Sequence, residues 1–523
     1  MSEPGPRSKA DVTETIKESK QLNRLSARGF AQGSFSLRLN PSETPPSPLP
    51  SIPRPPMSSL VWFRAALLSC CLVAAFPKAF AATPESPPNL IFLLVDDLGT
   101  DWIGAYGSRH PTPHIDRLAA RGVRFETAWT SPICTPSRVM LLTGQYPGRT
   151  GWIEHYDVPR WGGAGLIADR FPTWPQMLKR QGYATAIAGK WQINDLRLSP
   201  DVLQDHGFDR HCVWPGVESN NAPTARRYWD AYLQIDGNRK IHRGEYGPDI
   251  TQSFALDFIR QNRAKPFLLY YPMILVHDPN EPTPLNRGQP PSGEDALYAG
   301  SVTYMDRQVG ELLDELERLD LTGRTIVVFT GDNGSSSSGV LAGRPTPAGK
   351  GKTTQWGVRV PLIVSAPMIS KEARVTESLT DFTDLYPSIL ELAGIASTPS
   401  NDREGRSWVP LLRGARDYVG REWIFAQRNA SRTVRDRQFK LDSDGRFFDL
   451  IADPDELSPL ILSADDPRRK NRGRLAAALA SIPAASSTMP FPEYSPERMR
   501  EYTEKNAAER GGKKGGRKAG KAE

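Results

Sequence analysis

The sequence predicts an α/β protein with a large, mainly parallel sheet flanked by helices and a smaller α+β subdomain at its C-terminal end. Apolar runs alternate with amphipathic helical segments between residues 89 and 365, which is typical of strand–helix–strand units. After about residue 400 this pattern gives way to short strand-like segments separated by turns. Polar groups with compatible chemistry also follow the ends of several predicted strands, where open parallel sheets bind ligands.

The first half of the main domain contains two predicted strands. Residues 89–95 form a continuous apolar run, as expected for a strand buried on both faces of a parallel sheet. Helical patterns follow at residues 112–121 and 172–181, and Gly182 ends the second of them. Residues 183–188 predict the next strand.

The second half repeats the alternation. A helix over residues 251–262 precedes an apolar strand at 265–276, and a long helix over 297–320 ends at Gly323. One apolar stripe runs along the long helix: Met305, Val309, Leu312, Leu313, Leu316 and Leu319. Two further strands are predicted at 325–330 and 360–365.

The C-terminal part has a different character. Short antiparallel strands are predicted at residues 422–426, 439–442 and 447–450. Residues 415–500 are therefore interpreted as the smaller subdomain, and residues 82–414 as the main domain.

The N-terminal region is predicted to be absent from the mature protein. Residues 1–56 are rich in Pro, Ser and Arg, are predicted to be disordered, and are interpreted as a mis-called extension. Residues 57–81 begin with Met, contain a short apolar stretch and end in Ala-Phe-Ala, which is typical of a secretory signal peptide. Cleavage near Ala81 predicts export, to the periplasm or out of the cell. A signal anchor and a lipoprotein beginning at Cys70 are the alternatives.

The positive charge of the chain lies at its two ends. The net charge is +7, of which residues 1–81 carry +5 and residues 509–523 carry +4. The body is therefore slightly acidic, and no nucleic-acid groove is expected on it. The Gly/Lys-rich tail, residues 501–523, is predicted to be flexible. No apolar run reaches the ~18 residues of a membrane span, so none is expected.

Two pairs of oxygen donors follow predicted strands. Asp96 and Asp97 come directly after the first strand, and Asp332 and Asn333 follow the strand at 325–330. Adjacent buried carboxylates repel one another unless a cation lies between them. Hard oxygen donors favour Ca²⁺, with Mg²⁺ as the second choice, and disfavour Zn²⁺. Either pair alone is also typical of a strand-end turn or a helix cap.

Cys134 opens the segment Cys-Thr-Pro-Ser-Arg. Pro136 fits the first turn of a helix continuing to Gly144, so Cys134 is predicted to lie at a helix N-terminus, where the dipole favours an anion. Arg138 lies one helical turn further on and is placed to bind the same anion. An ordinary small buried cysteine is the alternative. Cys212, the other cysteine that remains after signal cleavage, and His114 are predicted to be structural.

The segment Cys134-x-Pro-Ser-Arg138, followed by Thr143-Gly144, resembles the signature of the type I, formylglycine-dependent sulfatases of the alkaline phosphatase superfamily. Further segments resemble the same family in the same order: VDDLG at 95–99, TPHIDRLAARGVRFETAW at 112–129, GKW at 189–191, TGDNG at 330–334 and GKGKTTQWGVRVP at 349–361. A weaker similarity is found in FFDLIADPDE at 447–456.

The resemblance implies an alkaline-phosphatase-like fold, with 82–414 as the catalytic domain, and hydrolysis of sulfate esters. It implies that Cys134 is oxidised to formylglycine by a maturation enzyme, and that Asp96, Asp97, Asp332, Asn333 and the modified residue 134 bind Ca²⁺. One hydroxyl of the hydrated formylglycine attacks sulfur, with Asp332 as base. The second hydroxyl then loses its proton, so that the aldehyde re-forms and sulfate leaves.

The resemblance also implies roles for several basic residues around the anionic group. Arg138 orients the nucleophile, Lys190 and Lys350 hold the sulfate, and Lys352 is a candidate because it lies two residues from Lys350. His277 protonates the leaving oxygen. Without the resemblance, each of the lysines is more typical of a solvated surface group, and His277 is more typical of a strand-end histidine with its hydrogen bonds satisfied.

Two positions depart from the family pattern. The family usually has a histidine two residues after the lysine of GKW, where this chain has Gln192. Glutamine donates and accepts hydrogen bonds but does not take up a proton near pH 7. His155 and His206 are the candidates to replace the missing base. The family's Glu-Gly-Gly before GVR is Gln355-Trp356-Gly357 here.

The substrate is expected to be set by three loops, residues 145–170, 193–250 and 278–296. Four tryptophans in these loops are candidates to stack on a sugar or aryl ring: Trp152, Trp161, Trp214 and Trp229. The predicted substrates are sulfated carbohydrates, with aryl sulfates as accidental ones. The alternatives are a phosphoesterase or phosphonate monoester hydrolase of the same superfamily, an inactive sulfated-glycan binding protein, and a nucleic-acid binder that uses the tail.

Overall fold

A computed structural model describes residues 87–161, 165–218, 221–370, 372–396 and 403–484. Three predicted segments lie outside the described residues: the disordered region at 1–56, the signal peptide at 57–81 and the tail at 501–523. No helix within the described ranges is long and apolar enough to cross a membrane.

The main sheet has eleven strands, and five neighbouring parallel strands form its centre. Their order across the sheet is β8 (Thr325–Gly331), β1 (Asn89–Val95), β7 (Phe267–Met273), β3 (Ala184–Lys190) and β4 (Arg210–Trp214). The strands predicted at 89–95, 183–188, 265–276 and 325–330 are all found here, and the predicted fold class is confirmed.

The two edges of the sheet contain antiparallel strands. β11 (Arg359–Ser365) pairs antiparallel with both β8 and β2 (Val123–Trp129). At the other edge β5 (Tyr232–Ile235) and β6 (Asn238–Ile241) form a hairpin beside β4. Sequence analysis missed β2, β4, β5 and β6, although Asp236-Gly237, both with positive φ, is a typical hairpin turn. β12 (Arg374–Thr376) and β13 (Thr380–Asp381) pair with β2 in parallel.

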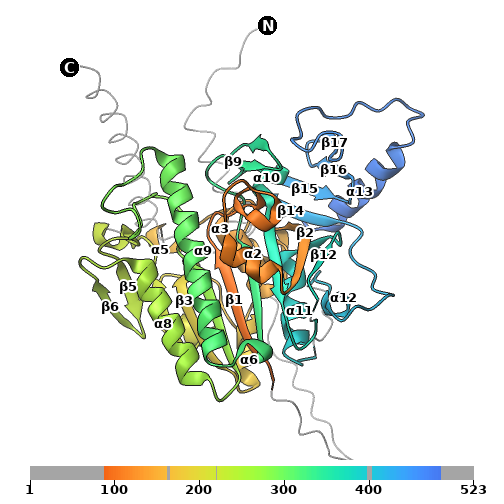
Figure 1. The fold of residues 1–523 in the computed structure, drawn as a ribbon. Helices are drawn as coiled ribbons and strands as arrows, with labels where there is room; N and C mark the ends of the chain where they lie inside the picture. Colours follow the sequence, from red (N-terminus) through yellow and green to blue (C-terminus); the bar gives the residue numbers. More distant parts are fainter. Residues whose placement is uncertain (1–86, 162–164, 219–220, 371, 397–402, 485–523) are drawn as a thin grey trace, which may run out of the picture. The chain divides into compact units, whose positions relative to one another are not determined.

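Alternate side chains of β1 enter two different hydrophobic cores, because successive side chains of a strand point to opposite faces. Ile91 and Leu93 pack with α2 (Pro113–Ala119), α8 (Gly247–Asn262) and α9 (Glu294–Arg318). Phe92 and Leu94 pack with α3 (Cys134–Thr143), α6 (Trp174–Arg180) and α11 (Leu385–Leu392). Figure 1 shows α8 and α9 in front of the sheet. The sheet is therefore covered on both faces, which leaves its edges and strand ends for function.

The long helix α9 differs in its bounds from the prediction. It ends at Arg318 rather than near residue 320, because Asp320 adopts a left-handed conformation, with φ of 55°, before Gly323 is reached. Five of the six predicted stripe residues are buried, and Leu319 packs partly buried against the same core.

A separate antiparallel sheet forms the C-terminal part. Its strands are β14 (Ile424–Arg428), β15 (Ser431–Arg435), β16 (Phe439–Asp442) and β17 (Phe447–Asp449), and α13 (Arg469–Ser481) packs on β15 and β16. Sequence analysis missed β15 and α13. Ile424 and Ala426 of β14 share a hydrophobic cluster with Trp129 of β2, so this sheet is packed directly against the main one.

Candidate active site

The predicted site residues converge at the carboxyl edge of the central strands. Asp96 and Asp97 follow β1, Lys190 is the last residue of β3, and Asp332 and Asn333 follow β8. His277 follows β7, which pairs with β1. Ligand atoms of Asp96, Asp97, Cys134 and His277 all lie within 4.8 Å of one another. Strands distant in sequence thus bring these groups together because parallel strands end at one edge.

Two unusual backbone conformations aim side chains into this cluster. Asp97 has a φ of 63°, in the left-handed region that aspartate tolerates better than most residues. Gly189, just before Lys190, has a φ of 118°, and a Cβ at this position would lie 2.0 Å from the carbonyl oxygen of Pro272. Only glycine fits here, and it lets the end of β3 approach β7 and carry Lys190 into the site.

Cys134 is the first residue of α3, and its side chain is buried within the cluster of site residues. The residue is 2 % exposed. Ser137 fixes the first turn by donating from Oγ to the carbonyl oxygens of Ser131, at 2.7 Å, and Ile133, at 2.9 Å. Burial raises the pKa of the Cys134 thiol to about 12, so the unmodified side chain is a neutral thiol at pH 7 and a poor nucleophile.

Arg138 links three segments of the site. Its Nε and Nη2 donate to Oδ2 of Asp332 at 3.0 and 2.8 Å, and its Nη1 donates to the carbonyl oxygen of Lys190 at 3.0 Å. Nη2 also lies 3.5 Å from Oδ1 of Asp96. The guanidinium therefore holds α3, β3 and β8 in a fixed relation, in addition to adding positive charge.

Each of two lysines pairs with one of the adjacent aspartates. Nζ of Lys190 lies 2.7 Å from Oδ2 of Asp96, and Nζ of Lys350 lies 2.6 Å from Oδ2 of Asp97. The backbone N–H of Asp97 donates to Oδ1 of Asp332 at 3.0 Å. Three carboxylates and three cations, with Arg138 as the third, are thus packed together in a buried space.

The pKa values of Asp332 and Asp96 are shifted in opposite directions. Burial raises the pKa of Asp332 to about 7, and the negative charges of Asp96 and Asp97 add to this effect. Burial also acts to raise the pKa of Asp96, but the positive charges of Lys190, His277 and Arg138 outweigh it and hold that pKa well below its usual range. The neighbouring negative charges disfavour the ionised form of Asp332, and a bound cation would offset this repulsion.

The donor set fits a hard divalent cation. Oδ1 of Asp96 and Oδ1 of Asn333 are both buried and have no hydrogen-bond partner among the described residues. Asn333 is oriented by donating from Nδ2 to Oδ1 of Asp97 at 2.9 Å, which leaves its carbonyl oxygen as the unused group. Unpaired buried acceptors cost free energy unless a ligand satisfies them. Carboxylate and amide oxygens suit Ca²⁺ or Mg²⁺ and do not suit Zn²⁺.

His277 lies between the cluster and solvent. Its Nε2 is 3.0 Å from Nζ of Lys350 and 3.8 Å from Oδ2 of Asp97. Its Nδ1 is 2.7 Å from Oδ1 of Asp278, a partner that sequence analysis did not identify. The carboxylate orients the ring so that Nε2 faces the cluster.

The structure distinguishes Lys350 from Lys352. Lys350 reaches Asp97, whereas Lys352 is exposed and its Nζ donates to the carbonyl oxygen of Ala348 at 3.0 Å. The prediction that Lys352 belongs to the site is therefore corrected. The turn between the two residues directs successive lysines to different sides, which spacing alone does not reveal.

The C-terminal sheet holds the segment that follows Lys350. The backbone N–H of Gln355 donates to Oε1 of Glu456 at 2.6 Å, and Nε1 of Trp356 donates to Oδ1 of Asp455 at 3.1 Å. Nη1 of Arg435 donates to Oε1 of Gln355 at 2.8 Å. The Gln-Trp-Gly segment thus connects the loop of Lys350 to the region of the weak C-terminal similarity.

Gln192 and two histidines occupy distinct surroundings. Gln192 donates from Nε2 to Oδ1 of Asp157 at 3.2 Å.

His155 Nδ1 lies 2.6 Å from Oγ1 of Thr135, the residue after Cys134. Burial lowers the pKa of His155 to about 3, and the charges of Lys190, His277 and Lys350 add to the effect. His206 is fully buried, with Nε2 at 3.1 Å from the carbonyl oxygen of Leu166, so it lies in the core and not in the site.

The predicted tryptophans are mostly packed. Trp152 and Trp214 are each 1 % exposed, so neither is available to stack on a substrate in this conformation. Trp229 is partly buried beneath the guanidinium of Arg287 and donates to the carbonyl oxygen of Pro282 at 2.7 Å. The side chain of Trp161 lies outside the described part of the structure. Cys212 is buried in the core, as expected for a structural cysteine. His114 packs closely against Gly310, where an added Cβ would lie only 2.4 Å from Nδ1 of the histidine, as expected for a structural residue.

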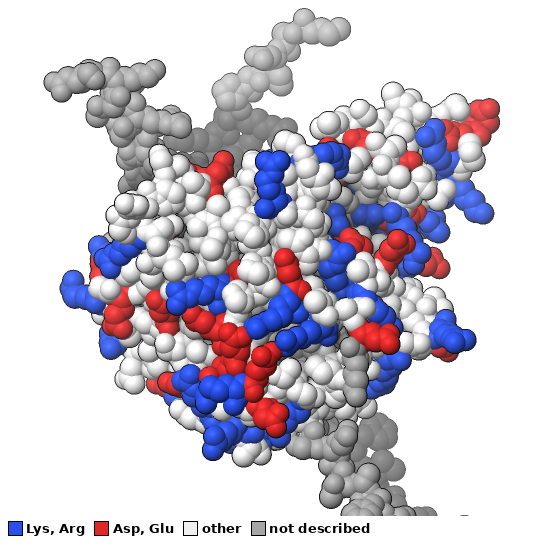
Figure 2. All heavy atoms as spheres, viewed as in Figure 1, with Lys and Arg blue, Asp and Glu red and all other residues white. Residues whose placement is uncertain are grey.

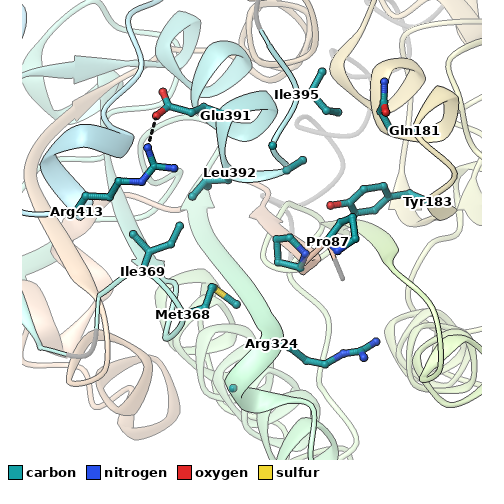
Figure 3. A pocket seen from close by; sticks show the side chains of 14 residues that line it. Pro87, Gln181, Tyr183, Arg324, Met368, Ile369, Glu391, Leu392, Ile395 and Arg413 are labelled. Atoms are coloured by element: carbon teal, nitrogen blue, oxygen red, sulfur yellow. Dashed lines mark hydrogen bonds and ion pairs between the residues drawn. The ribbon is translucent and has the colours of Figure 1, made fainter. Parts of the chain in front are cut away.

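A cavity of about 970 Å³ lies elsewhere on the molecule (Figure 3). It is lined by residues that precede the central strands: Pro87 before β1, Tyr183 before β3 and Arg324 before β8. It therefore lies at the amino ends of the central strands, whereas the acidic cluster lies at their carboxyl ends. Basic and acidic side chains are interspersed over the face shown in Figure 2.

Known proteins resemble the chain over most of its described length. The family model Sulfatase matches residues 88–395. Steryl-sulfatase of Mus musculus is 30 % identical over 467 residues, covering 72 % of this chain and 73 % of its own. N-acetylgalactosamine-6-sulfatase of Homo sapiens is 32 % identical over 356 residues, covering 64 % and 67 %. The crystal structure of Ps i-CgsB in complex with k-i-k-neocarrahexaose superimposes with a TM-score of 0.66 at 25 % identity, covering 79 % of this chain and 96 % of that one.

Proposed function

The chain belongs to the sulfatase family and is a sulfuric ester hydrolase, and from this premise we propose that it hydrolyses sulfate esters of carbohydrates through a formylglycine made from Cys134 beside a bound Ca²⁺. One observation supports this proposal above all others. The sulfur of Cys134 lies within 4.8 Å of ligand atoms of Asp96, Asp97 and His277, in a space shared with Arg138, Lys190 and Lys350.

The charge balance of the cluster supports the cation. The three carboxylates and the three cationic side chains cancel formally. A divalent cation held by Asp96, Asp97, Asp332, Asn333 and residue 134 would leave a net positive site that attracts the anionic sulfate group. When bound, this cation supplies a Lewis acid that lowers the pKa of the attacking hydroxyl.

The side chains of the chain perform the remaining tasks. Lys190 and Lys350 would bind the sulfate oxygens, since the carboxylates that they now contact would hold the cation. Asp332, which Arg138 holds at 2.8 Å, takes the proton of the attacking hydroxyl. His277 protonates the leaving oxygen through Nε2, while Asp278 holds its Nδ1.

Formylglycine supplies a group that a thiol lacks. A hydrated aldehyde at position 134 offers two hydroxyl groups on one carbon, in place of a single thiol. The first attacks sulfur and the alcohol leaves. The second then gives its proton to water, its oxygen forms the aldehyde C=O, and the C–O bond to the product sulfate breaks. We also propose that the protein is exported, because residues 57–81 have the pattern of a signal peptide.

Two measurements test this function together. Peptide mass analysis of the segment that contains Cys134 should find an aldehyde in place of the thiol when the protein is produced with a maturation enzyme. The modified enzyme should then cleave 4-nitrophenyl sulfate with a kcat/KM far above that for 4-nitrophenyl phosphate. A preference for the phosphate would instead support the phosphoesterase alternative, and glycan binding by a protein with an intact thiol would support the inactive binding protein.

A further inference from the structure

Residues 154–160, called the wall segment here, connect two parts of the active site. His155 contacts Thr135 beside the nucleophile position, and Asp157 contacts Gln192, two residues after Lys190. Glu154 anchors the segment through a salt bridge with Arg428, at 2.9 Å, and Arg428 in turn donates to the carbonyl oxygen of Gly351, next to Lys350. The wall segment is therefore held against both the nucleophile and a sulfate-binding lysine.

Asp157 and Gln192 face each other from strained backbone positions. Asp157 has a φ of 39° and Gln192 a φ of 54°, both in the left-handed region that non-glycine residues seldom adopt. Such conformations are energetically unfavourable and gather at functional sites. The strain brings Nε2 of Gln192 to 3.2 Å from Oδ1 of Asp157.

Asp157 and Gln192 have more hydrogen-bond acceptor sites than the donors of the described residues fill. Oε1 of Gln192 is buried, in a residue that is 6 % exposed, and has no partner among the described residues. Asp157 receives one hydrogen bond from Gln192 and an ion pair from Arg160 at 3.1 Å, whereas a carboxylate has about four lone-pair sites. Because Asp157 accepts only, it fixes the amide of Gln192 with the oxygen as the unused group.

The acceptors lie beside the sulfate-binding cations. The hydrogen bond with Gln192, two residues after Lys190, holds Asp157 beside the end of β3. Burial raises the pKa of Asp157, and the positive charges of Arg160, Lys190 and Arg227 act against this effect. Arg227 also donates to the carbonyl oxygen of Asp278, the residue after His277. A group attached to the bound sulfate would therefore meet Asp157 on leaving the cluster.

The unused acceptor oxygens of Asp157 and Gln192 favour a substrate that carries hydrogen-bond donors near the sulfate ester. The ring of a sugar sulfate carries hydroxyl groups next to the ester, whereas a steroid or a simple aryl sulfate carries none. An apolar ring beside Asp157 brings no donor to these acceptors, so it gains nothing from them.

We infer that Asp157 is a specificity-determining residue whose carboxylate, oriented by Gln192, accepts hydrogen bonds from hydroxyl groups of the sugar that bears the sulfate. This inference rests on the proposed sulfatase function and names the substrate class of the same site. It assigns no proton transfer to Asp157.

The test compares two substrate types in the Asp157→Asn and Asp157→Ala variants of the modified enzyme. On the best substrate from a panel of monosaccharide monosulfates, kcat/KM should fall about 30-fold, the usual loss for hydrogen bonds to a charged group. On 4-nitrophenyl sulfate it should change less than about 3-fold, since the aryl ring does not use these bonds. Asp195→Asn is the matched control, because Asp195 is also buried and paired with an arginine, Arg197, at 2.7 Å.

Binding to a variant without turnover gives a second readout. In a Cys134→Ala background, Asp157→Asn should weaken the binding of the monosaccharide sulfate and leave the binding of inorganic sulfate unchanged. Parallel losses on both substrates and both ligands, or no loss on the sugar, would overturn the role of Asp157. A modified wild type that cleaves neither substrate would overturn the proposed function, and the binding comparison would still decide the role of Asp157.

Discussion

The guanidinium of Arg138 lies against the carboxylate of Asp332, with Nη2 at 2.8 Å and Nε at 3.0 Å from the same oxygen. This contact joins the helix that begins at Cys134 to the end of strand β8. It fixes the proposed base relative to the nucleophile, and both residues are buried.

Replacement of Arg138 should therefore affect catalysis and stability together. Arg138→Lys keeps a charge but cannot make the contacts to Asp332 and to the carbonyl oxygen of Lys190 at once. We expect kcat/KM for 4-nitrophenyl sulfate to fall about 100-fold, and Arg138→Ala to cost about 3–5 kcal/mol in urea unfolding. Arg421, which is buried and lies 2.7 Å from Asp384 away from the site, gives the control: Arg421→Lys should lower stability and leave kcat/KM of the folded enzyme unchanged.

Asp332 should make the cation-free protein lose stability relative to the Asp332→Asn variant as pH rises from 4 to 7. The pKa of Asp332 is raised to about 7 in the folded state, so the folded protein binds more protons than the unfolded chain in this range, and stability falls with pH. The slope is at most about 1.4 kcal/mol per pH unit for one group. Asp96 does not contribute in this range, because its pKa is lowered and the group is ionised in both states.

Added Ca²⁺ should remove this pH dependence, since a bound cation favours the ionised carboxylate. Urea unfolding at several pH values, with EDTA or with Ca²⁺, measures both effects. A cation-free protein that gains stability relative to Asp332→Asn between pH 4 and 7 would contradict the assignment of Asp332 to a crowded acidic cluster.

Cys134→Ser should abolish turnover, because a serine offers one hydroxyl and no route to release sulfate. Cys212→Ser is the matched variant: Cys212 is buried in the core, away from the acidic cluster. We expect it to retain kcat and to lose about 1 kcal/mol of stability, from burying a hydroxyl. Steady-state assays and thermal unfolding separate the two, and equal activity of the two variants would count against the nucleophile.

Gln192→His should be tolerated. The imidazole can keep a hydrogen bond to Asp157, whose carboxylate now accepts from Nε2 of Gln192. Turnover of 4-nitrophenyl sulfate should stay within about 10-fold of the wild type, the effect of one hydrogen bond. Loss of sulfate binding in this variant, measured beside turnover, would show that the glutamine has a role that histidine cannot fill.

Glu456→Ala should loosen the loop of Lys350 from a distance. Glu456 accepts from the backbone N–H of Gln355 and pairs with Lys440, and both partners are buried. We expect a loss of about 1–3 kcal/mol and a raised KM for 4-nitrophenyl sulfate. Asp453→Ala is the control, because Asp453 caps only the exposed turn at Leu457 and Ser458 and should change neither quantity appreciably.

The order of the central elements and the identity of the strand-end residues follow from the sequence. The apolar run at 89–95 and the acidic pair after it predict a buried strand with polar groups at its carboxyl end, and β1 has these bounds. Local patterns carry this information because burial on both faces requires a continuous apolar run, and a covered sheet leaves its strand ends for ligands.

Tertiary structure alone decided which of the candidate groups meet. Lys350 and Lys352 have the same local pattern, and only the path of the loop places Nζ of Lys350 on Asp97. The partnership of Gln192 with Asp157 joins residues 35 positions apart, and no local pattern marks Asp157. Sequence determines which side chains are available, whereas distances between them depend on how non-adjacent segments pack, and periodicity within one segment does not encode that packing.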